Sequence, residues 1–314
     1  MRIAIAVLLV LAACCVSCRA QIPVELHETS ERSKGASSSK IRAALIRDLG
    51  RGYEVTGTGH YLVAHPRGQR TRWPQRFEEL YRSFVHYFAV RGLKLKEPSS
   101  PLVGIVCTDR RQFARYAAER GKQIQPGVFG YYSLRSNRNI VYDINGLAGV
   151  DDWHKTASVI IHESTHQTAF NTGVHSRWTP PPLWVAEGLA TMFEARGVCD
   201  SRHYPNRKDR INRAQLYAFK RLIPSRKPEI RSLIASDRLF QTNPHAAYAK
   251  AWALTFYLAE TRPRKYVKYL AKTAAHPPFT TVIASQRVTD FTSIFGKDWK
   301  MFEAKFMRFM AAVK

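Results

Sequence analysis

Hydrophobic and polar positions follow two different periods along the first half of the chain. Residues 53–65 alternate at every second position and are rich in β-branched and aromatic residues, which predicts a strand or hairpin. Residues 72–90 repeat their apolar positions at helical spacing, and residues 102–107 form a short apolar run typical of a buried strand. A hairpin is expected over 127–133 and 139–143. The first half is therefore predicted to be a small mixed sheet with a packing helix.

The second half of the chain is predicted to be mostly helical. An apolar run with helical character spans 159–170, and a second helix is expected to begin after the three prolines at 180–182. Residues 245–258 form another apolar helix. Aromatic residues at helical spacing over 291–313 predict a closing amphipathic helix.

These patterns predict an α+β fold in one domain over 51–314, with a sheet-containing half at 51–150 and a helical half at 151–314. The first apolar helix of the second half lies at the junction of the two halves. Residues 21–50 are polar and contain a Ser-Lys-rich stretch, which favours a flexible leader with a short helix over 41–49.

Residues 1–20 are typical of a signal peptide, because Arg2 is followed by an apolar run and then by small residues. Cys18-Arg19-Ala20 is an acceptable cleavage site, which would release a periplasmic or secreted chain. Leu11-Ala12-Ala13-Cys14 resembles instead a bacterial lipobox, which would attach a lipid to Cys14. The apolar run is short for a membrane span, and no later segment is apolar enough to span.

The cysteine count depends on this processing. Cleavage after Ala20 would leave only Cys107 and Cys199. An even pair in an oxidising compartment is a candidate disulfide, and two unpaired thiols are the alternative.

The chain is strongly basic, with 49 Lys and Arg against 24 Asp and Glu and a formal net charge of +25. Such a charge suits nucleic acid, an anionic lipid surface or an acidic envelope polymer. The sequence contains no nucleic-acid motif, no Cys-His finger spacing and no Gly-rich phosphate loop. Specific nucleic-acid binding is therefore not expected. The charge is typical of a generally basic exported protein that associates with the envelope, and an anionic envelope polymer or lipid surface is the alternative partner beside a substrate.

The main chemical motif is the pentapeptide 162–166, which reads H-E-S-T-H. Residues i and i+4 of a helix share a face, so the imidazoles of His162 and His166 can point at one metal ion. Glu163 lies about 100° further round the helix, where it can deprotonate a zinc-bound water without ligating the metal. The alternative is a buried helix whose histidines hydrogen-bond to neighbours.

A catalytic zinc site with two histidines needs one more protein ligand. Glu187 lies among apolar residues of the second helix, where a carboxylate is costly to bury unless it meets a cation. Zinc is such a cation, and a salt bridge to an arginine is the alternative. Glu194 is a competing ligand, but its position near the helix end favours a solvated side chain.

The two motifs, H-E-x-x-H and then W-V-A-E-G-L-A-T-M-F-E at 184–194, resemble those of the gluzincin (peptidase-MA-like) zinc metallopeptidases. More narrowly, they are similar to an uncharacterised bacterial exported family that reads H-E-x-T-H-Q and then W-x-x-E-G-x-A-T-x-F-E. The likeness is strong over 151–197 and implies a zincin-like fold with His162, His166 and Glu187 as zinc ligands. It also implies that Glu163 is the base that later acts as acid.

The chain departs from the gluzincin pattern at Thr191, where many members have an Asp that orients a ligand histidine. In several gluzincins a Tyr or His from a later helix donates a hydrogen bond to the oxyanion. By this resemblance Tyr248 is the first candidate and His245 the second; an ordinary half-buried aromatic is the alternative for Tyr248. The resemblance also implies that an edge strand binds the substrate backbone, for which Gly130–Ser133 is the candidate.

The sequence therefore predicts a zinc-dependent metallopeptidase that hydrolyses peptide bonds in the bacterial envelope or outside the cell, with Glu163 activating the zinc-bound water. Two alternatives are open. One is a catalytically weak, zinc-bearing envelope protein that binds anionic polymers through its basic surface. The other is a zinc amide hydrolase that acts on cell-wall cross-links.

Overall fold

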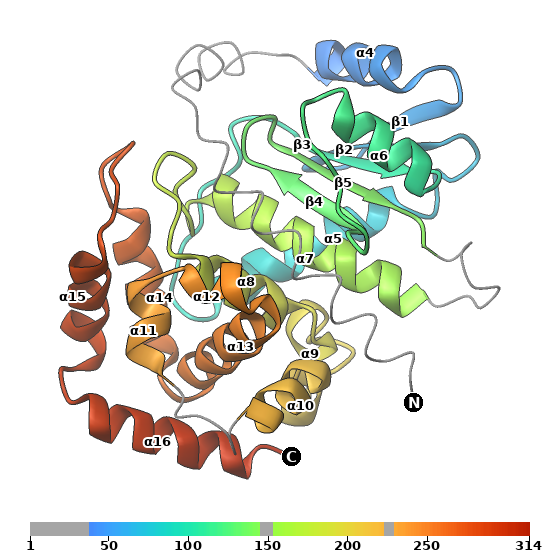
Figure 1. Ribbon diagram of the computed structural model, residues 1–314. Coiled ribbons are helices and arrows are strands. Elements are labelled where there is room, and N and C mark those ends of the chain that lie inside the picture. Colours follow the sequence, from blue (N-terminus) through green and yellow to red (C-terminus); the bar gives the residue numbers. More distant parts are fainter. Residues whose placement is uncertain (1–37, 145–152, 223–228) are drawn as a thin grey trace. The chain divides into compact units, whose positions relative to one another are not determined.

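The computed structural model describes residues 38–144, 153–222 and 229–314 and divides into two compact units (Figure 1). Among the described residues, the first unit comprises those up to Arg82 together with those of Glu97–Thr168, and the second comprises those of Ser83–Lys96 together with those of Ala169–Lys314. The predicted signal peptide, the lipobox and most of the predicted leader lie outside the described residues.

The first unit is built on a five-stranded mixed sheet in the order β1-β2-β3-β5-β4. β1 and β4 are antiparallel to their neighbours, whereas β2, β3 and β5 run parallel to one another. The sheet confirms the predicted α+β fold. Its strands are β1 (Tyr53–Gly57), β2 (Tyr61–Pro66), β3 (Leu102–Cys107), β4 (Gly130–Ser133) and β5 (Arg138–Tyr142).

One face of the sheet carries an apolar core covered by α4 (Ser38–Leu49) and α6 (Arg110–Ala118). Leu45 of α4 and Phe113 of α6 are fully buried against alternate residues of β3, such as Ile105. The short helix expected over 41–49 is part of α4, and its apolar positions face the sheet and contribute to this core.

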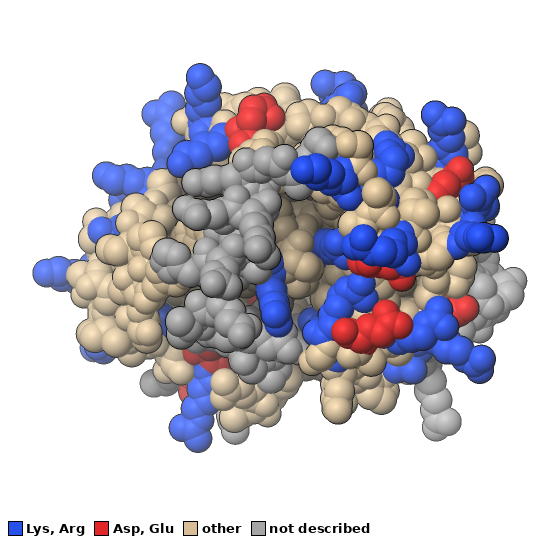
Figure 2. Space-filling model, turned by 90° about the horizontal axis from the view of Figure 1, so that it is seen from above, with Lys and Arg blue, Asp and Glu red and all other residues tan. Residues whose placement is uncertain are grey.

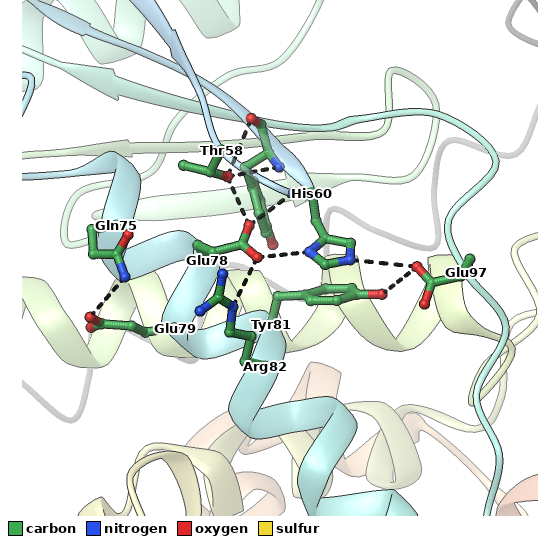
Figure 3. A network of polar contacts seen from close by, with 9 residues as sticks. Thr58, His60, Gln75, Glu78, Glu79, Tyr81, Arg82 and Glu97 are labelled. Atoms are coloured by element: carbon green, nitrogen blue, oxygen red, sulfur yellow. Dashed lines mark hydrogen bonds and ion pairs between the residues drawn. The ribbon is translucent and has the colours of Figure 1, made fainter.

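On the other face, α5 (Pro74–Ala89) is fastened to the β1–β2 turn by a polar network (Figure 3). The buried Glu78 carboxylate accepts hydrogen bonds from the Thr58 hydroxyl at 2.8 Å and from the His60 N–H and Nδ1 at 2.9 and 2.8 Å. The His60 ring stacks on Tyr81, and its Nε2 lies 3.5 Å from Glu97. Burial raises the pKa of Glu78, but the hydrogen bonds from His60 and Thr58 outweigh burial and hold this pKa below its usual range.

The second unit is helical and is centred on α8 (Leu183–Phe193) and α13 (Pro244–Thr261). α13 is buried from Ala246 to Ala259, as its continuous apolar sequence requires. The other helices of this unit are α9 (Arg196–Cys199), η2 (Arg207–Arg210), α10 (Arg213–Leu222), α11 (Ile230–Ala235), α12 (Arg238–Thr242), α14 (Pro263–Ala274), α15 (Ala284–Phe295) and α16 (Trp299–Ala312).

The prediction of one closing helix over 291–313 was wrong. α15 ends at Phe295, and α16 begins at Trp299 with the Asp298 side chain accepting a hydrogen bond from the Met301 N–H. Gly296 lies between them with φ of +100°, a conformation that interrupts a helix and that glycine adopts without strain. The aromatic spacing predicted the buried faces correctly but not this break.

The candidate disulfide is not formed. Cys107 and Cys199 are both free and buried. Cys107 lies on β3 in the core of the first unit, and Cys199 lies in α9 of the second. Burial raises the pKa of each thiol to about 12. Among the described helices, none has the length and apolar character needed to cross a membrane.

Candidate metal centre

The helix that carries the H-E-x-x-H motif, α7 (Trp153–Thr172), is held on the sheet by polar contacts. Gln167 donates through Nε2 to the Val103 carbonyl of β3 at 3.1 Å and to the Asn137 carbonyl at 2.9 Å. The Asn139 amide of β5 donates to the Ser164 hydroxyl at 2.9 Å. Because hydrogen bonds are directional, these contacts set the rotation of α7 about its axis. They therefore decide where the residues between them point.

Edge strand β4 lies directly against this helix. A Cβ at Gly130 would lie 2.7 Å from a methyl group of Val159 and 2.8 Å from one of Val141, so only glycine permits this approach. Two residues further along β4, the Tyr132 N–H donates to Glu163 Oε2 at 2.7 Å. Glu163 is 2% exposed, and its other oxygen, Oε1, has no hydrogen-bond partner within the described part of the chain. One oxygen of this carboxylate is thus anchored while the other remains available.

Three side chains lie close together at the H-E-x-x-H motif. Ligand atoms of His162, His166 and Glu187 lie within 4.8 Å of one another, and all three residues are buried. The two Nε2 atoms of the histidines are 3.1 Å apart. This group can hold a metal ion, because it offers imidazole nitrogens and a carboxylate oxygen around one point.

The position of Glu187 depends on how α8 packs in the second unit. A Cβ at the next residue, Gly188, would lie 2.6 Å from the Ala251 carbonyl oxygen of α13 and would overlap the Thr255 hydroxyl. The two helices therefore touch through their backbones at this point. Glu187 is 1% exposed, and its neighbours on α8 are also buried.

Glu194, the competing ligand in the sequence, is outside the group that can hold a metal. Its carboxylate accepts a hydrogen bond from the Asn212 amide at 2.9 Å, next to the end of α8. The same amide donates to the carbonyl of Thr191, which is fully buried. Thr191 therefore supplies no carboxylate that could orient a histidine of the group.

The two oxyanion candidates occupy different surroundings. Tyr248 is 3% exposed in α13, and its ring packs edge-on against Phe240. It shares a helix face with Ala251 and Thr255, the residues that meet Gly188. His245 lies in the first turn of α13 and is exposed.

Sequence reasoning did not identify two of the groups that shape this centre. The contact from the Tyr132 N–H to Glu163 involves a backbone donor, so no side-chain type could reveal it. The packing role of Gly188 had a signal, since glycine inside a buried helix is destabilising unless another element approaches closely.

Comparison with known proteins adds a family without an assigned activity. Residues 156–280 match the model of a family described as "Protein of unknown function (DUF1570)". The matched range contains the pentapeptide, Glu187 and all of α13. A search of curated proteins found no match to the chain.

Proposed function

We propose that this protein is a zinc-dependent metallopeptidase that hydrolyses peptide bonds in the bacterial envelope or outside the cell. The observation that carries the proposal is the state of Glu163. One of its oxygens is anchored by the Tyr132 N–H, and the other is buried without a partner among the described residues, next to the ligands in sequence. A general base needs such an oriented carboxylate with one oxygen available.

Zinc fits the donor set. Two imidazoles and one carboxylate are the protein ligands of a common type of catalytic zinc site, which keeps its fourth position open. Two nitrogens at zinc-ligand distance in a tetrahedral arrangement are about 3.3 Å apart, and the Nε2 atoms of His162 and His166 are 3.1 Å apart. When bound, zinc would supply Lewis-acid polarisation of a carbonyl and would lower the pKa of water.

Glu163 would move the proton in this reaction. Its Oε1 would take a proton from the attacking water and would then pass it to the nitrogen of the leaving amine. The hydrogen bond from the Tyr132 N–H to Oε2 keeps the carboxylate in one orientation during both transfers. This contact also places β4 directly over the base.

The substrate would bind along β4, the last strand of the sheet in the order of pairing. An extended peptide can add to such an edge through main-chain hydrogen bonds. The strand has the bounds predicted for it, Gly130–Ser133. Tyr248 is the proposed donor to the oxyanion, with His245 as the second candidate.

The test compares the purified wild type with Glu163→Gln for zinc content and for cleavage of a peptide library. Glutamine keeps an oxygen that can accept from the Tyr132 N–H but cannot take a proton at neutral pH. We expect one zinc per chain in both proteins and a loss of cleavage in the variant of about 10²-fold or more. Absence of zinc from the wild type would refute the proposal.

A binding function is the second candidate, and the charge of the chain favours it. Basic side chains are spread over the face shown in Figure 2, with few acidic ones among them, and the formal net charge is +25. An anionic envelope polymer or lipid surface would be the partner. Zinc in both proteins with peptide cleavage in neither would favour this function or a zinc amide hydrolase of cell-wall cross-links. Digestion of purified cell wall separates these two.

A further inference from the structure

The second metal-ligand helix, α8, lacks a capping side chain of its own. The residue before it is Pro182, which makes no side-chain cap. The first N–H groups of a helix have no partner within the helix, and a buried helix end needs one from elsewhere. Here the Leu183 N–H donates to Oδ1 of Asp237, a residue distant in sequence, at 3.0 Å.

Asp237 is itself held by a buried arginine. Arg287 Nη1 lies 3.0 Å from Asp237 Oδ1, and Nη2 donates to Oδ2 at 3.1 Å. Both residues are buried, at 5% and 6% exposure. Arg287 Nε in turn donates to the Val282 carbonyl at 3.1 Å. Two parallel hydrogen bonds fix the plane of the carboxylate, so the cap has one orientation.

A buried ion pair is a costly way to cap a helix, because both charges lose their hydration. An ordinary serine, threonine or aspartate before α8 would serve the helix alone. Asp237 also begins α12 (Arg238–Thr242), but its side chain makes no cap there and reaches α8 instead. The Asp237–Arg287 ion pair therefore connects α8 rigidly to α15, a connection that capping alone would not require.

The connection acts about one helical turn from Glu187. Leu183 and Glu187 are four residues apart, so they lie on one face of α8 and about 6 Å apart along its axis. A shift of the first turn would move the Glu187 carboxylate relative to its partners. We infer that Asp237, oriented by Arg287, is a positioning residue that holds Glu187 in the geometry needed for metal binding. This inference rests on the proposed function.

The test measures Zn²⁺ affinity of the full chain by competition with a chromophoric chelator, together with amide hydrogen exchange in α8 and stability to denaturant. Asp237→Ala removes the cap and Asp237→Asn keeps an oxygen for the Leu183 N–H. We expect Asp237→Ala to weaken Zn²⁺ binding about tenfold and to speed exchange in the first turn of α8. Asp237→Asn should recover most of the affinity.

The matched control is Asp290→Ala, on the same helix as Arg287. Asp290 is 2% exposed and accepts from His276 Nε2 at 2.8 Å, so its loss also removes a buried carboxylate. We expect lower stability with unchanged Zn²⁺ affinity. If Asp237→Ala does not fold, Arg287→Lys carries the test. Lysine cannot make both hydrogen bonds to the Asp237 carboxylate, so this variant should lower the Zn²⁺ affinity by a smaller factor.

The outcomes separate this inference from the proposed function. Wild-type Zn²⁺ affinity in a folded Asp237→Ala protein would overturn the inference and leave the proposed function standing. An equal loss of affinity in Asp290→Ala would also overturn it, because a general loss of stability would then explain the result. A wild type that binds no Zn²⁺ would overturn both.

Discussion

Replacing Gly188 by alanine should weaken the metal centre without touching a ligand. The added Cβ would lie 2.6 Å from the Ala251 carbonyl oxygen, whereas ordinary contact begins at 3.4 Å. This oxygen belongs to the backbone of a buried helix, so α8 and α13 must separate by about 0.8 Å. Because Glu187 precedes this residue, the separation also displaces a member of the group that can hold a metal ion.

The magnitude follows from two opposing terms. Overpacking a buried site costs up to about 3 kcal/mol. The upper end of this range applies here because the added Cβ would overlap backbone atoms. Alanine is better than glycine in a helix by about 1 kcal/mol. The net loss is about 2 kcal/mol, which corresponds to a fall in Tm of roughly 4–8 °C.

The assay is thermal and denaturant unfolding, with Zn²⁺ affinity measured on the same samples. Gly52→Ala is the control, since a Cβ there meets nothing within 4 Å. It should be neutral or slightly stabilising. Adding Thr255→Ala to Gly188→Ala should recover only part of the loss, because the Ala251 carbonyl remains. A Gly188→Ala protein with unchanged Tm and Zn²⁺ affinity would refute this account of how α8 is placed.

Two further predictions concern ionisable groups outside the centre. The pKa of Glu78 is lowered on folding, so its ionised form contributes stability above the pKa of the unfolded chain, and this contribution is lost as pH falls through the folded pKa. Glu78→Gln should therefore be less stable than the wild type at neutral pH and should lose less stability on acidification. Denaturant unfolding across pH measures both effects. An equal dependence of stability on pH in the variant and the wild type would contradict this prediction. Burial raises the pKa of the Cys107 and Cys199 thiols to about 12. At pH 8 we therefore expect both thiols to be alkylated on the order of 10³-fold more slowly in the native protein than in the unfolded chain. Mass mapping of their peptides measures these rates.

Most of the secondary structure follows from local patterns in the sequence. The period of two over 53–65 and the helical period over 72–90 correspond to the β1–β2 hairpin and to α5. The pairing of His162 with His166 is local as well, because four residues along a helix return to the same face. The sequence by itself therefore determined most of the elements and the shared face of the two histidines, and it named Glu187 as the third residue without fixing where that residue lies.

Packing decided the rest. The placement of Glu187 within its own unit depends on the packing of α8, through its contact at Gly188 and, as we infer, through Asp237. Such contacts join residues far apart in sequence, so no period or spacing reports them. The same reason explains the unformed bond between Cys107 and Cys199, which composition alone allowed. Chain connectivity dictates which residues share a helix face, whereas only the close packing of whole elements dictates which faces meet.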